Sequence, residues 1–138
     1  MSLTSDITAI LQADHTLMTT LTGGVQDTVE ITRQITPTAF DANGEIKPCA
    51  LVRTGSEAPI FTKTMAVQTP VIIYFYQRTG YDKIDAALAR VFTLLAQRHL
   101  GTLGIWELQF NSEIARTTDE ALACSLAVQR YNAIRKRG

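Results

Sequence analysis

The sequence predicts an α+β fold: a mainly antiparallel sheet with one long crossover helix and a short N-terminal helix. Residues 71–76 are a run of β-branched and aromatic side chains, which is typical of a buried strand. After Gly80, apolar residues recur at helical spacing through residues 82–100. Strand-like segments follow around residues 104–111 and 122–131, so one helix is expected to cross the back of one sheet.

The composition is that of an ordinary globular protein, and we expect one domain over residues 1–138. Hydrophobic residues make up 46% of the chain and charged residues 19%. The 13 basic and 13 acidic residues give no net charge, which does not indicate binding to nucleic acid or to a membrane surface. No apolar stretch approaches the roughly 20 residues that span a bilayer, and no signal peptide is evident. Cys49 and Cys124 match no metal-site spacing, so buried reduced thiols are expected.

The first part of the chain is predicted to form two short helical segments and a strand. Apolar residues at helical spacing predict the N-terminal helix, with caps expected from residues 4–6. Asp14 is expected to cap a second short helix, which the glycine pair at residues 23–24 ends. Alternating residues over 25–32 then predict a strand.

The middle of the chain is predicted to leave the sheet and return to it. Residues 33–47 are expected to form an ordered excursion around the turn signal at residues 41–44. A short strand at residues 49–53 follows, then a loop at residues 54–59. Residues 60–68 are partly polar and predict a further strand, either an edge strand or a hairpin arm.

The central strand and the long helix give the clearest patterns. Pro70 is expected at the start of the strand, where a missing N–H is tolerated. Both faces of residues 71–76 are apolar, so this strand is predicted to be covered on both sides, or on one side by another subunit. Asp82 is expected to cap the helix and Gly101 to lie just beyond its end. One apolar stripe of this helix should face the sheet: Ile84, Leu88, Val91 and Leu95.

No constellation in the sequence predicts catalysis or a cofactor. His15 and His99 are not tied to a nucleophile or a carboxylate cluster, so surface or capping roles are expected. Asp82 and Asp85 share one helix start, where carboxylates complement the helix dipole. A catalytic triad stays open, because its members converge only in space. We therefore predict no catalytic, cofactor-binding or metal-binding residues.

A pattern of elements runs along the chain, made by residues 7–14, Leu17, Leu21, residues 24–25, residues 72–76, residues 81–88 and residues 119–122. In this order it resembles the tail terminators, or tail-completion proteins, of long-tailed bacteriophages. Proteins of this family cap the finished tail tube as a ring, usually a hexamer, and present the surface to which the head-side connector joins. The resemblance implies a virion structural protein, without enzymatic activity, cofactor or metal.

The resemblance also implies the partners and the location. The partners would be further copies of the chain, the tail tube protein and the head–tail connector proteins. Genome DNA would pass through the channel without sequence-specific binding, and no membrane is involved. The expected location is the tail–neck region of the virion, after assembly in the host cytoplasm. Two alternatives stay open: a head-to-tail connector or stopper of the neck, and a small hydrolase or nuclease with an unrecognised site.

Assembly contacts are expected from two irregular segments and from the basic C-terminal residues. The apolar residues of the irregular segments need a partner surface once the sheet and helix have formed their own core. The alternative is that they pin long loops onto their own subunit and that the basic residues form a solvated tail. The candidate interface residues are Ile35, Phe40, Ile60, Phe61, Met65, Val67, Arg135, Lys136 and Arg137.

Overall fold

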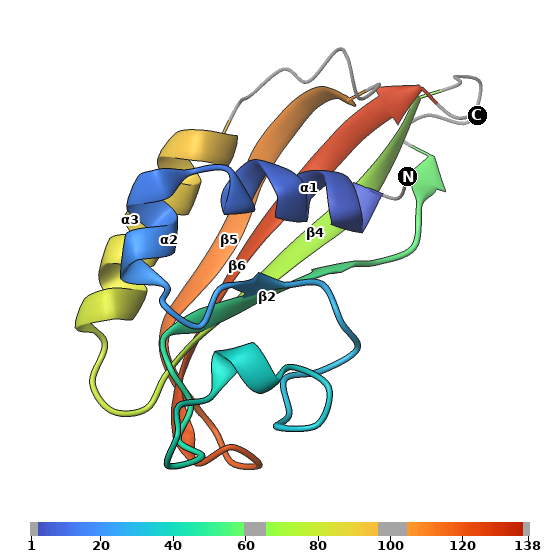
Figure 1. Ribbon diagram of the computed structural model, residues 1–138. Coiled ribbons are helices and arrows are strands. Elements are labelled where there is room, and N and C mark those ends of the chain that lie inside the picture. The colour runs from blue at the N-terminus through green and yellow to red at the C-terminus, as the bar shows by residue number, and fades with distance from the viewer. Residues whose placement is uncertain (1–2, 60–65, 97–104, 137–138) are drawn as a thin grey trace.

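The computed structural model describes residues 3–59, 66–96 and 105–136, arranged as in Figure 1. The elements in chain order are α1 (Leu3–Gln12), α2 (His15–Thr20), β1 (Val25–Gln26), the 3-10 helix η1 (Pro37–Ala39), β2 (Cys49–Thr54), β3 (Ala58–Pro59), β4 (Ala66–Gln77), α3 (Asp82–Leu95), β5 (Ile105–Asp119) and β6 (Cys124–Lys136). Within these ranges no helix is long and apolar enough to cross a membrane.

The strands form one sheet in the order β1-β2-β4-β6-β5, and β3 pairs with β4 off this path. β1 runs parallel to β2, whereas the other described pairs are antiparallel. β4 and β5 therefore run in the same direction, with β6 between them, and α3 connects the one to the other. The predicted α+β fold with a crossover helix is confirmed.

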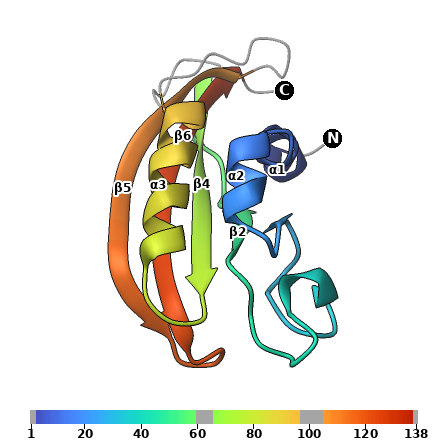
Figure 2. The same ribbon diagram turned by 60° about the vertical axis from the view of Figure 1, so that its left-hand side comes forward.

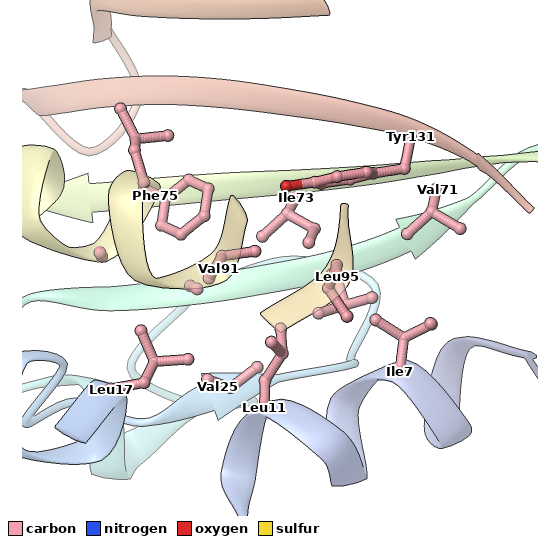
Figure 3. Packing of buried hydrophobic residues seen from close by; sticks show 14 of the residues in the cluster. Ile7, Leu11, Leu17, Val25, Val71, Ile73, Phe75, Val91, Leu95 and Tyr131 are labelled. Carbon is pink, nitrogen blue, oxygen red and sulfur yellow. The ribbon is translucent and has the colours of Figure 1, made fainter. Parts of the chain in front are cut away.

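All three α-helices cover the same face of the sheet (Figures 1 and 2). The predicted stripe of α3 is buried, and its residues share one cluster with side chains of α1, α2 and the strands. Figure 3 shows how side chains such as Leu11 and Val91 meet Ile73 and Phe75 between the helices and the sheet. Because this burial removes most of the apolar surface of α3 from water, it supplies the main force that holds the helix in place.

On the opposite face of the sheet, a second cluster of described residues lies at one end. Residues 27–47 fold over this end, so Ile31 and Ile46 pack against Leu51 and Tyr76. A turn inside the excursion is held by the Asp41 carboxylate, whose Oδ1 accepts from the backbone N–H groups of residues 43 and 45 at 2.9 Å each. The predicted ordered excursion is confirmed, and it covers the second face of the central strand at this end.

One predicted strand is shorter than expected, and the described part of another belongs to a longer strand. Of residues 25–32, only Val25–Gln26 form a strand. Beyond it, Arg53 Nη1 of β2 donates to Thr28 O at 3.1 Å. Of residues 60–68, the described part begins at residue 66 and is the start of β4 rather than a separate strand. Residues 60–65 lie outside the described residues.

The ends of α3 differ from the prediction. Asp82 is the first helical residue and not the cap. The free N–H groups of Lys83 and Ile84 donate instead to Gln77 Oε1, at 3.0 and 3.1 Å. The helix ends at Leu95 with Ala96 as its C-cap, and residues 97–101 of the predicted helix end lie outside the described residues.

Pro70 lies inside β4 and not at its start. β2 ends opposite Val71, and the backbone N–H of Gly55 donates to Pro70 O at 2.9 Å on that side. The side of Pro70 that lacks an N–H therefore faces the gap between β2 and β3, where no hydrogen bond of the sheet is lost.

The predicted helix caps have different outcomes. Residues 4–6 lie within α1 and do not cap it. Asp14 does cap α2, because its carboxylate accepts from the Leu17 N–H at 2.8 Å.

Candidate assembly surfaces

Several acidic side chains of the described residues hold elements of the fold together. Asp85 bonds to Arg116 in two places, at 2.5 and 2.8 Å, which lowers the pKa of the carboxyl. Asp119 Oδ1 accepts from the Leu122 N–H at 2.8 Å within the β5–β6 turn. His15 is exposed at the start of α2. In this part of the chain, no His, Cys, Asp and Glu side chains gather in a group that could hold a metal ion.

The two cysteines are buried thiols, as expected from the sequence. Burial, the largest cause, raises the pKa of Cys49 to about 12 and that of Cys124 to about 11. Both thiols are therefore protonated at neutral pH, and neither is an activated nucleophile.

The apolar residues chosen from the sequence occupy different environments. Ile35 is 45% exposed on the excursion, whereas Phe40 packs against the second cluster. Val67 is only 3% exposed, because β4 turns it toward the helix-covered side of the molecule. The other three, Ile60, Phe61 and Met65, lie outside the described residues. Of the described apolar candidates, Ile35 is therefore the one whose side chain another subunit can contact without a change in this subunit's fold.

Two of the three basic candidates, Arg135 and Lys136, belong to the last strand. Arg135 lies in β6, and its Nη2 bonds to Glu57 Oε1 at 2.5 Å. Lys136 is the last residue of β6, and Arg137 lies outside the described residues. The ion pair ties the end of β6 to the loop before β3, which partly neutralises the positive charge expected there.

An apolar groove that the sequence did not predict lies between α3 and the edge strand β5. Phe92 of α3 and Phe110 of β5 meet edge to face with ring centroids 5.2 Å apart, and they are 46% and 40% exposed. Phe110 in turn contacts the buried Tyr131 ring at 5.7 Å. Hollows of about 670 and 540 Å³ flank the phenylalanine pair. We call this surface the α3–β5 groove; it is lined by Phe92, Thr93, Ala96, Glu107, Gln109, Phe110 and Glu113.

One end of this groove is closed by a clamp of side chains. Tyr81, just before α3, donates from its hydroxyl to Thr117 O of β5 at 2.6 Å. Arg116 lies over the Tyr81 ring, with its guanidinium carbon 4.5 Å from the ring centroid, while it pairs with Asp85. The clamp fixes the start of α3 to the end of β5.

A third surface lies where the excursion meets the β5–β6 turn. Val29 is 76% exposed beside a hollow of about 410 Å³ that Tyr74 and Leu122 also line. A neighbouring hollow of about 390 Å³ is bordered by an ion pair between Arg78 and Glu45, 2.8 Å long. Both hollows are at the end of the molecule opposite to the chain termini (Figure 1).

Comparison with known proteins gives a match in fold. No family model matches the sequence, and no curated protein matches it. Among the solved structures that match is a chain of the "Virion of native gene transfer agent (GTA) particle". It shares 17% sequence identity, and the superposition covers 98% of this chain and 95% of that chain with a TM-score of 0.71. At this identity the likeness shows that the two chains have the same fold over nearly their whole length.

Proposed function

We propose that this protein is a structural component of a phage-like virion and acts as a tail terminator. The observation that carries the proposal is the fold shared with a chain of a gene transfer agent virion across nearly the full length of both chains. The resemblance of the element pattern to tail terminators supports the specific role.

In this role, copies of the chain form a ring, which we propose to be a hexamer, between the tail tube and the head-side connector. Such a ring needs two different surfaces on each subunit, because each copy meets its neighbours through a heterologous contact that closes. The exposed Ile35 and the basic end of β6 at Arg135 are proposed to take part in these contacts. The absence of net charge favours the close packing of identical subunits. Genome DNA passes through the channel without sequence-specific contacts.

The mass of the purified protein, alone and mixed with tail tubes, tests this proposal. We expect a species of six times the 15.2 kDa chain mass that binds to one end of a tube. A strictly monomeric protein that does not bind tubes would contradict the proposal. Binding to the head-side connector but not to tubes would favour a connector or stopper of the neck instead.

A pair of neighbouring substitutions tests the proposed contact at the excursion. Ile35→Asp places a charge on an exposed apolar side chain, so it should leave the subunit folded but prevent the ring. Gln34→Asp adds the same charge one residue away and serves as the matched control. If Ile35→Asp still forms the larger species, Ile35 is not in the contact. Val67 is unsuitable for this test, since a charge on its buried side chain would unfold the protein.

A further inference from the structure

The outer edge of β5 is a long strand edge without a strand beside it among the described strands. β5 has 15 residues and is the last strand in the sheet order, with α3 next to it (Figure 2). Proteins usually keep edge strands short or cover them, because unpaired backbone N–H and C=O groups accept further strands. A strand of this length at the edge therefore calls for an explanation.

Among the described strands, none pairs with the outer edge of β5, and one stretch of this edge is regular. The clamp of Tyr81 and Arg116 occupies the far end, at Thr117. The register of β5 with β6 is broken between Phe110 and Ser112 and again between Ile114 and Thr117. From Glu107 to Phe110 the pairing is unbroken, so this stretch has the regular backbone that a short added strand requires.

The α3–β5 groove lies directly beside this stretch and supplies an anchor. The half-exposed rings of Phe92 and Phe110 offer apolar surface that the subunit itself leaves in water. A strand added along Glu107–Phe110 places alternate side chains toward the groove. An apolar or aromatic side chain there would bury the two rings and so anchor the added strand.

The negative charges around the groove favour a partner strand that carries positive charges. β5 carries three carboxylates and one arginine, and that arginine, Arg116, is already paired with Asp85. Glu107 and Glu113 line the groove on either side of Phe110. The added strand should therefore carry basic side chains around its apolar anchor.

A second copy of this chain does not meet that description. Two β5 edges paired over the regular stretch would place Glu107 of one copy opposite Phe110 of the other and would bring no basic side chain to the groove. The basic strand β6 is already held between β4 and β5. The short strands β1 and β3 have two residues each. Among the described strands, none offers a free basic edge of sufficient length.

We propose that the open edge of β5 binds an extended, basic segment of a different protein, which joins the sheet as a short strand and covers the Phe92–Phe110 pair. This assignment goes beyond the proposed role in a ring, because it concerns a contact with another kind of protein and does not require the ring. It can be tested on the isolated protein.

The test is a titration of the ¹⁵N-labelled protein with three synthetic peptides, followed by amide NMR shifts. The first peptide is Lys-Thr-Lys-Val-Phe-Val-Lys-Thr-Lys, blocked at both ends. The second has Glu in place of each Lys, and the third is the basic peptide N-methylated at alternate residues. The basic peptide should shift the amides of residues 107–113 and bind at least about tenfold more tightly than the acidic peptide. The N-methylated peptide should not bind, because it cannot complete the ladder.

Substitutions in the protein complete the test. Glu107→Lys should reverse the preference between the basic and acidic peptides, and Glu113→Gln should weaken it while keeping the acceptor for Gln129. A variant with Asp27→Lys, an exposed acid far from the groove, controls for net charge. Equal binding of acidic and basic peptides, binding of the N-methylated peptide, or shifts located elsewhere would each overturn the proposal. So would a free protein whose residues 107–113 become protected as its concentration rises, since a second copy would then occupy the edge.

Discussion

At the scale of single residues, Asp14 joins two helices through one carboxylate. Its Oδ2 accepts from Leu17 N and Arg90 Nε, both at 2.8 Å, and its Oδ1 accepts from Arg90 Nη2 at 2.6 Å. The bonds from Arg90 are the main reason that the pKa of Asp14 falls to about 2. Because this folded-state pKa lies below the ordinary value of 3.8, the stabilisation is complete at neutral pH and is lost as the pH falls toward 2.

Asp14→Asn should therefore lower the free energy of unfolding at pH 7 by about 1 kcal/mol, allowing for the partial exposure of Arg90. Asparagine keeps the N-cap acceptor, so the loss reports the ion pair and not the cap. Denaturant unfolding of both proteins from pH 7 to pH 2 measures the effect, with Asp27→Asn as an exposed control. The difference between wild type and variant should shrink toward pH 2; a constant difference would show that the ion pair is not its cause.

Gln129 is a buried polar residue whose amide is fully used. Its Nε2 donates to Leu88 O of α3 at 3.2 Å and to Glu113 Oε1 at 2.8 Å, and its Oε1 accepts from the Tyr131 hydroxyl at 2.7 Å. We expect Tyr131→Phe and Gln129→Leu each to cost about 1–3 kcal/mol, because each leaves a buried partner unsatisfied. The double variant should cost less than the sum, as measured by a double-mutant cycle in urea. Strict additivity would mean that the two groups are not coupled.

At the scale of elements, α3 begins where a strand residue supplies its cap. Replacing Gln77 by Leu removes the acceptor for the Lys83 and Ile84 N–H groups. We expect a loss of about 1–2 kcal/mol, as for the removal of other N-caps. Hydrogen exchange should accelerate at these two amides more than at Leu88 in the middle of the helix. Uniform acceleration along α3 would instead indicate a loss of packing, and Gln34→Leu on the exposed excursion provides a control.

The interiors of the elements could be predicted from the sequence because their patterns are local. The apolar stripe of α3 repeats every three or four residues, and the run at residues 71–76 is uniformly apolar. The ends of elements depend on partners far along the chain. Gln77 reaches Ile84 across a turn, and Arg53 binds the Thr28 carbonyl over 25 residues. No local pattern records such contacts, so the cap of α3 and the early end of β1 were mispredicted.

The α3–β5 groove could not be predicted for a related reason. Phe92 lies off the main stripe of α3, and Phe110 lies in a half-polar strand. Each residue alone is an ordinary surface aromatic. Their contact depends on the insertion of β6 between β4 and β5, which sets how far the edge strand lies from the helix. Element spacing along the chain does not specify that insertion.

At the scale of the whole molecule, the two hydrophobic clusters differ in size. The reactivity of the two cysteine thiols can measure how often the smaller cluster opens. Cys49 and Cys124 both belong to the cluster on the second face. Their raised pKa values make the folded thiols unreactive, so labelling requires that this face opens. We expect opening at a free energy below that of global unfolding, because fewer buried residues hold this end.

The rate of thiol labelling, measured as a function of urea concentration, tests this expectation. At low urea the rate should depend only weakly on urea, because little surface is exposed in a local opening. Cys49→Ala and Cys124→Ala assign the two rates separately. A steep dependence at all concentrations would mean that both clusters open together and that the molecule unfolds as one unit.

The central place of β6 also has a consequence for synthesis of the chain. β6 pairs with β4 along one side and with β5 along the other, yet it follows both of them in the sequence. While the ribosome is still making residues 1–123, β4 and β5 are therefore separated strands with a missing neighbour between them. The sheet closes only after translation has passed residue 136 and this segment has left the exit tunnel. A nascent chain of this kind exposes two strand edges until its final pairing step, which makes that interval the one in which it is most exposed to aggregation and most in need of a chaperone.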